Sequence, residues 1–234
     1  MDYKDKVLPI MRETRKILLP HWGKAKILYQ KNASAVNVVT KLDIEIEKFI
    51  SSRLTKLFPD IKFVGEESGG NRNAERYWIM DPVDGTQHLV RGTPFTTTMI
   101  ALVEEGKVIF SVIYDFINDQ MYWAKKGQGS FCEKTRLKVS NRTLNQEYIC
   151  WETHLEKPKN QKIFGALYNK TIMFKTVSAG WEFAMVASGK FDARICFDPH
   201  GNDYDYAPGS LLVSEAGGVV TNLFSKEYNL KNTN

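Results

Sequence analysis

The sequence predicts an α/β protein in which helices and a mixed β-sheet form layers. Two observations lead to this prediction. Strand-like segments joined by a short turn occupy the first half of the chain, whereas strand-like and helix-like segments alternate in the second half. The composition agrees, since 43% of the 234 residues are hydrophobic and 25% are charged. These values are usual for a globular protein and exclude a disordered tail, a collagen-like fibre and a disulfide-rich miniprotein.

Two helices are predicted near the N-terminus. In residues 3–19 apolar side chains recur at helical spacing, and Pro20 is expected to end the helix. Apolar side chains recur in the same way in residues 46–58, and Pro59 closes that segment. Asp43 lies just before the second segment and could be its N-cap.

Strands and further helices follow. Short β-rich segments predict strands at residues 61–64, 77–80, 96–103, 108–114 and 120–124. A Glu-Glu-Gly turn at residues 104–106 joins two of them as a hairpin. In the second half, strands are expected at 172–177 and 191–197 and helices at 181–187 and 206–216, the last one ended by Gly217 and Gly218.

Charge and cysteine content exclude several classes of protein. The 32 basic and 27 acidic residues give a net charge of +5, which is compatible with a small anionic ligand but requires none, and the dense basic stripe typical of a nucleic-acid binder is missing. The sequence contains neither an apolar run of about 20 residues nor a signal-peptide pattern, so we expect a cytoplasmic protein with no membrane partner. Cys132, Cys150 and Cys196 are far apart, which indicates buried reduced thiols rather than a zinc site or a disulfide framework.

Acidic residues recur at the ends of predicted elements. Glu66 and Glu67 follow one strand, Asp81 and Asp84 lie at the end of the next, and Asp205 begins a helix far downstream. Strand ends in α/β proteins converge on a ligand-binding crevice, so these carboxylates can meet there. Because packed carboxylates repel one another, such a cluster needs a cation. Oxygen ligands without histidine or cysteine favour a hard ion such as Mg²⁺.

The segment from Asp81 to Thr86 adds a second signal. The proline after Asp81 turns the chain, so Asp81 and Asp84 can face the same point together with the carbonyl group of Val83. Gly85 lets the backbone approach a ligand closely. Gly85 and Thr86 can open a short helix whose N–H groups bind an anion. A cation site beside an anion site indicates phosphate chemistry.

Each of these signals also has an ordinary structural interpretation. An Asp-Gly pair is a common turn, and two adjacent glutamates are commonly part of a solvated loop. Asp43 and Asp205 could simply be helix N-caps. The combination of all of them favours the functional interpretation.

Three stretches of the sequence resemble the inositol monophosphatase family of Mg²⁺-dependent, lithium-sensitive phosphatases. They are Gly-Glu-Glu-Ser at 65–68, Trp-Ile-Met-Asp-Pro-Val-Asp-Gly-Thr at 78–86, and Tyr-Asp-Tyr-Ala-Pro-Gly at 204–209 leading to Glu-Ala-Gly-Gly at 215–218. The resemblance covers nearly the whole chain and is weak at 145–175. It implies a phosphoric monoester hydrolase with one αβαβα domain over residues 1–234, made of an N-terminal part to about residue 140 and a C-terminal part from about 141.

The resemblance also implies a metal site for two or three Mg²⁺ ions. Glu66, Asp81 and the carbonyl group of Val83 would hold the first ion. Asp81, Asp84 and Asp205 would hold the second, and Glu66 would help to hold a third. Two Mg²⁺ ions can activate water and neutralise the leaving group in an in-line displacement.

Catalytic and substrate-binding roles follow from the same resemblance. Asp43, Thr86 and Glu66 would be the catalytic residues. Asp43 and Thr86 would orient and deprotonate the attacking water, and the amides of Gly85 and Thr86 would bind the phosphate. Ser178, Ala179 and Asp198 would contact the substrate beyond the phosphate, Asp198 because it lies seven residues before Asp205.

Three residues depart from the family pattern and keep two interpretations each. His88 is either a surface or helix-facing residue or a substrate contact. Glu182 is either a substrate contact or an exposed helix residue. Asp203 could compete with Asp205 as a metal ligand, although the register of the motif favours Asp205.

These departures lie on the substrate side, so the resemblance leaves the substrate open. Inositol monophosphate leads, and fructose 1,6-bisphosphate, histidinol phosphate and adenosine 3′,5′-bisphosphate are alternatives. A regulatory protein of the same fold, with RNA or an RNA polymerase as partner, is a further alternative. The family commonly forms dimers, so a homodimer is expected. The family also usually adds a strand and a helix after the position of residue 228, which would leave one sheet edge less covered here.

Overall fold

The computed structural model describes residues 3–31, 38–143, 147–197, 201–222, 225, 226, 228 and 230. The helices in this part are α1 (Lys4–Leu18), a 3₁₀ turn η1 (Leu19–His21), α2 (Lys41–Leu57), α3 (Thr86–Arg91), α4 (Pro158–Tyr168), α5 (Ala179–Ala187) and α6 (Asp203–Glu215). A seven-stranded sheet contains, in spatial order, β3 (Lys62–Gly65), β4 (Arg76–Asp84), β5 (Thr97–Glu104), β6 (Lys107–Asp115), β7 (Gln120–Lys125), β8 (Gly129–Cys132) and β9 (Thr135–Arg136).

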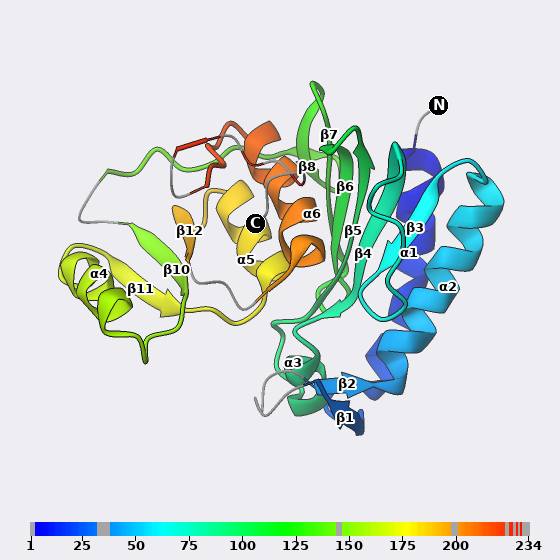
Figure 1. Cartoon of the computed structure of the whole chain (residues 1–234), viewed down its shortest axis with the longest axis horizontal. Coiled ribbons are helices and arrows are strands. Elements are labelled where there is room, and N and C mark those ends of the chain that lie inside the picture. The colour runs from blue at the N-terminus through cyan, green and yellow to red at the C-terminus, as the bar shows by residue number, and fades with distance from the viewer. Residues whose placement is uncertain are drawn as a thin grey trace.

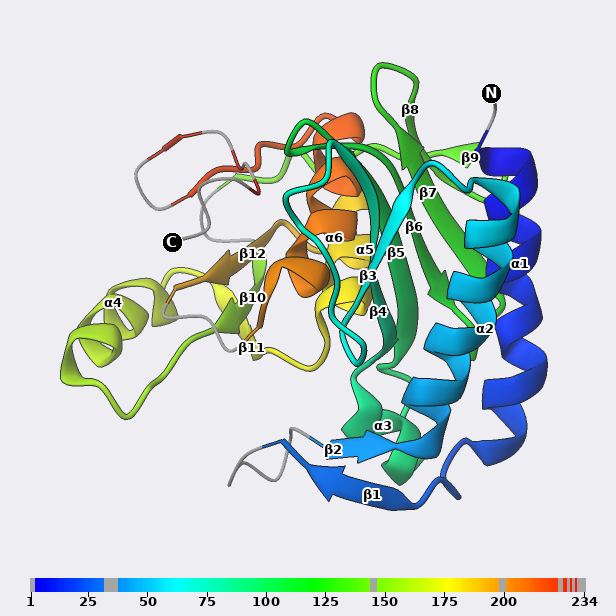
Figure 2. The ribbon, with the colours of Figure 1, turned by 45° about the vertical axis from the view of Figure 1, so that its right-hand side comes forward.

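Two smaller sheets complete the strands of the described part. One pairs β1 (Ile27–Gln30) with β2 (Val38–Thr40), and the other has the order β11 (Ile172–Lys175), β10 (Tyr148–Glu152) and β12 (Ala193–Cys196). Both neighbours of β10 run parallel to it, whereas β1 and β2 are antiparallel. Figure 2 shows the pair β1–β2 lying at one end of the molecule, next to α3.

Helices and sheets alternate as layers. Helices α1 and α2 cover one face of the large sheet, and α5 and α6 cover its other face (Figure 1). The small sheet of β10, β11 and β12 lies beyond α5, with α4 on its far side (Figure 1). This arrangement confirms the predicted αβαβα fold. The large sheet is mixed, as predicted, because β3 and β4 are parallel and its other pairs are antiparallel.

Strand β4 is buried on both of its faces, since helices cover both sides of the sheet. Trp78 and Met80 face the core beneath α1 and α2, whereas Tyr77 and Ile79 face the α6 side. The ladder between β4 and β5 shifts register after Asp81, which pairs with Met99, and resumes at Asp84, which pairs with Thr97. A shift of this kind redirects side chains at a sheet edge. It redirects the end of β4, where Asp81 and Asp84 lie.

Most of the predicted elements are present with ends that differ by a few residues. The capping assignments need correction. Helix α2 begins at Lys41 because Thr40 is its N-cap, and Asp43 occupies the third position of a capping box. In the same way Asn202 caps α6 and Asp205 is its third residue, so neither aspartate is an N-cap.

Some elements were not predicted from the sequence. These are α4, β1, β2, β8, β9 and β10. Cys132, Cys150 and Cys196 are free thiols, but only Cys150 is buried; the other two are half-buried, which corrects that part of the prediction. Among the described helices, none is both long enough and apolar enough to span a membrane.

Candidate active site

Three aspartates converge where β4 ends and α6 begins. Asp81, Asp84 and Asp205 each contribute one carboxylate oxygen to a group whose members all lie within 4.8 Å of one another. We call these three residues the acidic cluster. Asp81 and Asp84 are only 3% and 5% exposed. The Val83 amide donates to Asp81 Oδ1 over 3.0 Å and fixes that carboxylate.

Asp84 is held by the N-terminus of α5. The amides of Ala179 and Gly180 donate to its two carboxylate oxygens over 3.0 and 2.8 Å. The Thr97 hydroxyl donates to Asp84 Oδ2 over 2.9 Å. The first N–H groups of a helix lack partners within the helix and carry a partial positive charge, which suits a carboxylate. The amide of Ala179, a predicted substrate contact, therefore has Asp84 as its hydrogen-bond acceptor.

Asp203 and Asp205 point to different partners. Asp203 receives hydrogen bonds from the Arg72 guanidinium, including one of 3.0 Å from Nη2 to Oδ1. Asp205 receives one from the Asn202 amide and joins the acidic cluster. The structure therefore places Asp205 beside Asp81 and Asp84. Asp205 is the aspartate that the register of the motif favours.

Burial and mutual repulsion disfavour the charged forms of these acids. Burial is the main cause that raises the pKa of Asp81 and Asp205 well above the ordinary value, and each is raised further by the neighbouring carboxylates. Burial also raises the pKa of Asp84, although its hydrogen bonds act in the opposite direction. A cation placed among these oxygens would relieve both effects.

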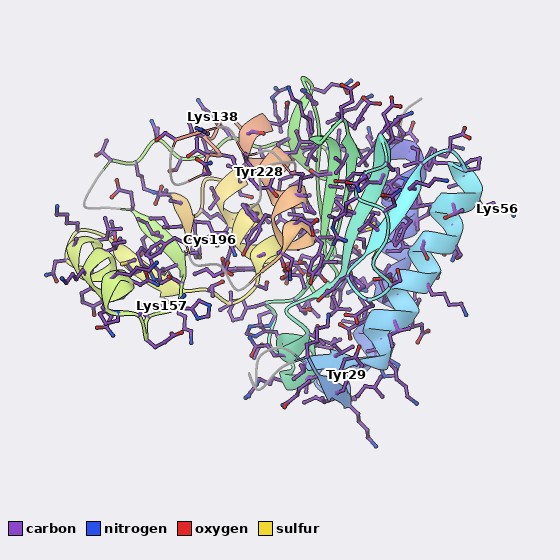
Figure 3. The ribbon with its side chains drawn as sticks, viewed as in Figure 1. Tyr29, Lys56, Lys138, Lys157, Cys196 and Tyr228 are labelled. Atoms are coloured by element: carbon purple, nitrogen blue, oxygen red, sulfur yellow. The ribbon has the colours of Figure 1, made fainter. Side chains whose placement is uncertain are left out.

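Glu66 and Glu67 lie beside the acidic cluster and share a lysine. Lys31 Nζ donates to Glu66 Oε1 over 2.6 Å and to Glu67 Oε1 over 2.7 Å. Glu66 also contacts Asp81, which raises the pKa of Asp81. Tyr29 on β1, seen at the lower end of the molecule in Figure 3, donates to Glu67 Oε2 over 3.3 Å. Sequence reasoning missed Lys31, because a single lysine 35 residues before its partner carries no local signal.

Asp43 and Thr86, the two residues predicted to act on water, are in direct contact. Thr86 Oγ1 lies 2.8 Å from Asp43 Oδ1 and 2.8 Å from the Val83 carbonyl oxygen. The other oxygen of Asp43 accepts from the amide and hydroxyl of Thr40, over 2.8 and 2.7 Å. Burial raises the pKa of Asp43. This geometry gives the Thr86 hydroxyl a fixed acceptor.

Gly85 occupies the turn between β4 and α3. Its φ of +74° is in the left-handed region, and a Cβ there would lie 2.5 Å from the Phe95 carbonyl oxygen and 2.9 Å from Ser178 Cβ. Only glycine fits this position. Helix α3 begins at Thr86, which confirms the predicted short helix.

Ser178, one of the predicted substrate contacts, lies next to this turn. Ser178 is buried as the N-cap of α5, and its side chain approaches Asp84, where it offsets part of the rise in pKa that burial causes. Asp198 lies outside the described residues.

His88 and Glu182 have protein partners instead of an exposed position. His88 Nε2 lies 3.1 Å from the Val177 carbonyl oxygen and Nδ1 lies 2.6 Å from Thr93 Oγ1, so both ring nitrogens are engaged. Glu182 is fully buried, which corrects its interpretation as an exposed helix residue. It accepts from the Val177 amide over 2.6 Å and from Arg194 Nε over 2.8 Å.

Comparison with known proteins shows similarity over nearly the whole chain. The sequence profile of the Inositol monophosphatase family matches residues 6–234. A Thermotoga maritima protein named fructose-1,6-bisphosphatase/inositol-1-monophosphatase is 30% identical over 98% of this chain and 88% of its own length. The Nus factor SuhB of Xylella fastidiosa is 31% identical over 89% of this chain and 78% of its own.

Solved structures are also similar to this chain over nearly its whole length. The structure of an IMPase from Thermotoga maritima superimposes with a TM-score of 0.87 at 29% identity, covering 99% of this chain and 89% of that one. With the family profile matched across nearly the whole chain and Asp81, Asp84 and Asp205 gathered in one cluster, the chain belongs to the inositol monophosphatase family and is a phosphoric monoester hydrolase.

Proposed function

We propose that this chain hydrolyses a small phosphate monoester in a Mg²⁺-dependent reaction, with inositol monophosphate as the leading substrate. One observation carries the proposal, namely the convergence of the three carboxylates of the acidic cluster within 4.8 Å, two of them buried and that of Asp205 half-buried. Such a group is unfavourable without a cation, and its all-oxygen donors fit Mg²⁺. The uncatalysed hydrolysis of phosphate monoesters is extremely slow, so the reaction needs strong charge stabilisation.

The donors present divide into two sets that share Asp81. Asp81, Asp84 and Asp205 would hold one Mg²⁺, and Glu66, Asp81 and the Val83 carbonyl oxygen would hold a second. Glu66 would also assist a third ion. When bound, Mg²⁺ polarises the phosphate, stabilises the leaving alkoxide and makes water more acidic.

Asp43 and Thr86 handle the proton of the attacking water. Thr86 Oγ1 accepts that proton while its own proton passes to Asp43 Oδ1, 2.8 Å away. The bonds from Thr40 hold the other Asp43 oxygen, so the acceptor oxygen stays aimed at Thr86. A raised pKa makes Asp43 a stronger base than an exposed aspartate. The amides of Gly85 and Thr86 bind the phosphate oxygens.

The alcohol part of the substrate is selected by the residues that contact it beyond the phosphate. Ser178 and Asp198 are the proposed contacts to it. Fructose 1,6-bisphosphate is the second candidate, because the relative from Thermotoga maritima carries both activities in its name. Histidinol phosphate and adenosine 3′,5′-bisphosphate follow.

A regulatory role on the same fold is the competing candidate. It is favoured by the similarity to a protein named as a Nus factor. Substitution Asp43→Asn separates the two. In an enzyme it removes the base and lowers turnover while Mg²⁺ binding persists, whereas a protein that only binds a partner is unaffected.

We also propose that the chain forms a homodimer. Strand β11 lies at the edge of the small sheet, and Phe174 on it is exposed. Phe174 stacks with Tyr148 and Phe191, with ring centroids 5.5 and 5.2 Å away. An exposed aromatic group on a sheet edge is suited to contact with a second copy. The molecular mass in solution, measured by light scattering, tests this.

The function is tested by phosphate release with and without Mg²⁺. The panel consists of inositol 1-phosphate, fructose 1,6-bisphosphate, histidinol phosphate, adenosine 3′,5′-bisphosphate and 2′-AMP. We expect Mg²⁺-dependent release from inositol 1-phosphate, and Asp43→Asn is the matched inactive control. Release from another member of the panel would assign that compound as the substrate. Release from none of them, with Mg²⁺ bound, would favour the regulatory role.

A further inference from the structure

Helix α2 carries a second buried acid one turn after Asp43. Residues four apart lie on the same face of a helix, so Glu47 points to the same side as Asp43. Glu47 is 4% exposed, yet it is not a member of the acidic cluster. Its carboxylate points at the turn that follows β3. Oε2 accepts from the Glu67 amide over 2.8 Å and Oε1 accepts from the Ser68 amide over 2.9 Å.

The fit between this carboxylate and the turn is tight. A Cβ built on Gly65 would lie 2.2 Å from Glu47 Cδ, so a side chain at residue 65 and Glu47 exclude each other. The turn is closed by two hydrogen bonds of 3.0 Å between the backbones of Gly65 and Gly69. Glu47 therefore occupies the space that the glycine leaves open.

Glu66 lies inside this turn and is aimed by it. Its amide donates to the Met80 carbonyl oxygen over 3.1 Å, which places it against β4 next to Asp81. The two residues after Glu66 donate their amides to Glu47. The backbone of Glu66 is thus fixed on one side by β4 and on the other by α2.

We propose that Glu47 is a positioning residue that holds the turn of Glu66 in the geometry needed to bind Mg²⁺. The inference rests on the proposed metal-binding role of Glu66. A carboxylate that accepts two backbone N–H groups forms strong, charge-assisted hydrogen bonds. Residues that orient metal ligands without touching the metal commonly change its affinity 10–100-fold when altered. One face of α2 then serves both halves of the site, with Asp43 holding Thr86 and Glu47 holding the turn of Glu66.

Glu47→Gln tests this with little change in volume. The glutamine has only one acceptor oxygen, so one of the two backbone amides loses its partner or meets an N–H₂ group. We expect calorimetric Mg²⁺ affinity to fall about 10–100-fold. The Mg²⁺ concentration that gives half-maximal phosphate release should rise in parallel, and saturating Mg²⁺ should restore much of kcat.

Glu215→Gln is the matched control. Glu215, at the end of α6, accepts from the amides of Gly127 and Gly129, each over 2.8 Å, in the turn between β7 and β8. Asp205 lies at the start of the same helix, so Glu215 makes the same kind of contact at the opposite end of α6. Glu215→Gln should leave Mg²⁺ affinity within about twofold of wild type, because it touches neither Glu66 nor the acidic cluster.

The outcomes separate clearly. A weaker affinity in Glu47→Gln alone supports the inference, whereas an unchanged affinity, or an equal loss in both variants, overturns it. If Glu47→Gln does not fold, Glu47→Asp replaces it. Its side chain is one methylene shorter and cannot reach both amides, and wild-type Mg²⁺ affinity in that variant overturns the inference.

Wild-type protein that binds Mg²⁺ but releases no phosphate contradicts the proposed reaction alone, because calorimetry needs no turnover. Wild-type protein that binds no Mg²⁺ overturns both.

Discussion

Two groups of buried acids lie close together in this molecule and balance their charge differently. The acidic cluster brings together three carboxylates, and each has a raised pKa. The second group, which we call the arginine cluster, contains Glu152, Arg194 and Glu182. Arg194 is paired with both glutamates, and its side chain is 5% exposed. The arginine cluster contains its own cation, whereas the acidic cluster needs one from outside.

The arginine cluster also supports the elements that carry the acidic cluster. Glu182 belongs to α5, whose N-terminus binds Asp84. The Tyr206 hydroxyl donates to Glu152 Oε1 over 3.1 Å, and Tyr206 directly follows Asp205 in α6. The guanidinium of Arg194 lies 5.0 and 5.2 Å from the ring centroids of Phe183 and Tyr206. The difference teaches that a buried group of acids supports the fold when it contains its own cation, and serves ligand binding when the cation must come from outside.

Removing one carboxylate from the acidic cluster should have the largest effect on activity. Asp84→Asn keeps the shape but removes a shared negative charge, so we expect Mg²⁺ affinity to fall by at least about 100-fold, beyond the usual effect of residues that only orient a ligand. Turnover should become undetectable. The change relieves repulsion but leaves the Ala179 or the Gly180 amide facing an N–H₂ group, so the melting temperature without Mg²⁺ measures the balance of these two effects. Calorimetry and thermal melts measure both, and wild-type Mg²⁺ affinity in Asp84→Asn would contradict the assignment.

The opposite substitution in the arginine cluster should affect stability instead. Arg194→Met leaves Glu152 and Glu182 buried without their cation. Breaking a buried ion pair from one side costs about 3–5 kcal/mol of the free energy of unfolding. Urea denaturation measures this loss.

A combined variant checks whether the unpaired charges of Glu152 and Glu182 cause this loss of stability. Arg194→Met with Glu152→Gln and Glu182→Gln removes the whole charge network, and it should recover part of the stability lost in Arg194→Met alone. A triple variant that is less stable than Arg194→Met would show that hydrogen bonding, and not charge balance, dominates in this cluster.

The effect of pH on the acidic cluster gives the next prediction. The pKa of Asp81 and of Asp205 is raised by burial above the ordinary value of 3.8. The folded state without metal therefore binds more protons than the unfolded state above that pH, so these residues favour folding at low pH and oppose it as pH rises through their raised pKa. Mg²⁺ offsets the repulsion. Its stabilising effect, about 2.7 kcal/mol at 100 times Kd, should grow with pH in thermal melts, and removal by EDTA should reverse it. An effect independent of pH would contradict the prediction.

The local parts of the site could be predicted from the sequence. Asp81, Asp84 and Thr86 lie within six consecutive residues. A proline and a glycine there restrict the backbone, so the local sequence largely determines how these side chains are placed. The strong strands and the two N-terminal helices were predictable for a similar reason, because their apolar periodicity is clear.

Contacts between distant residues could not be predicted. Lys31, Glu47 and Arg194 each bind partners that lie 12 or more residues away, and a single charged residue looks the same in sequence whether it faces solvent or a buried acid. The helix α4 was missed because only Asn160 among its residues is buried, so it lacks an apolar face. The burial of Glu182 was missed because the partner that neutralises it lies on another element.

The smallest expected effect concerns His88, which links α3 to the segment before α5. Since a carbonyl oxygen only accepts, Nε2 donates to Val177, and in the neutral ring Nδ1 accepts from the Thr93 hydroxyl. Burial lowers the pKa of His88 from its ordinary value of 6.5. Below that pH the unfolded state binds more protons, so the contribution of His88 to stability is present above about pH 6.5 and is lost as pH falls through its lowered pKa. His88→Gln should cost about 1 kcal/mol at neutral pH, and the gap to wild type should narrow in acid. Parallel stability curves for the two proteins would show that His88 does not stay neutral in the fold, and would assign it to the charged surface instead of to the packing between α3 and α5.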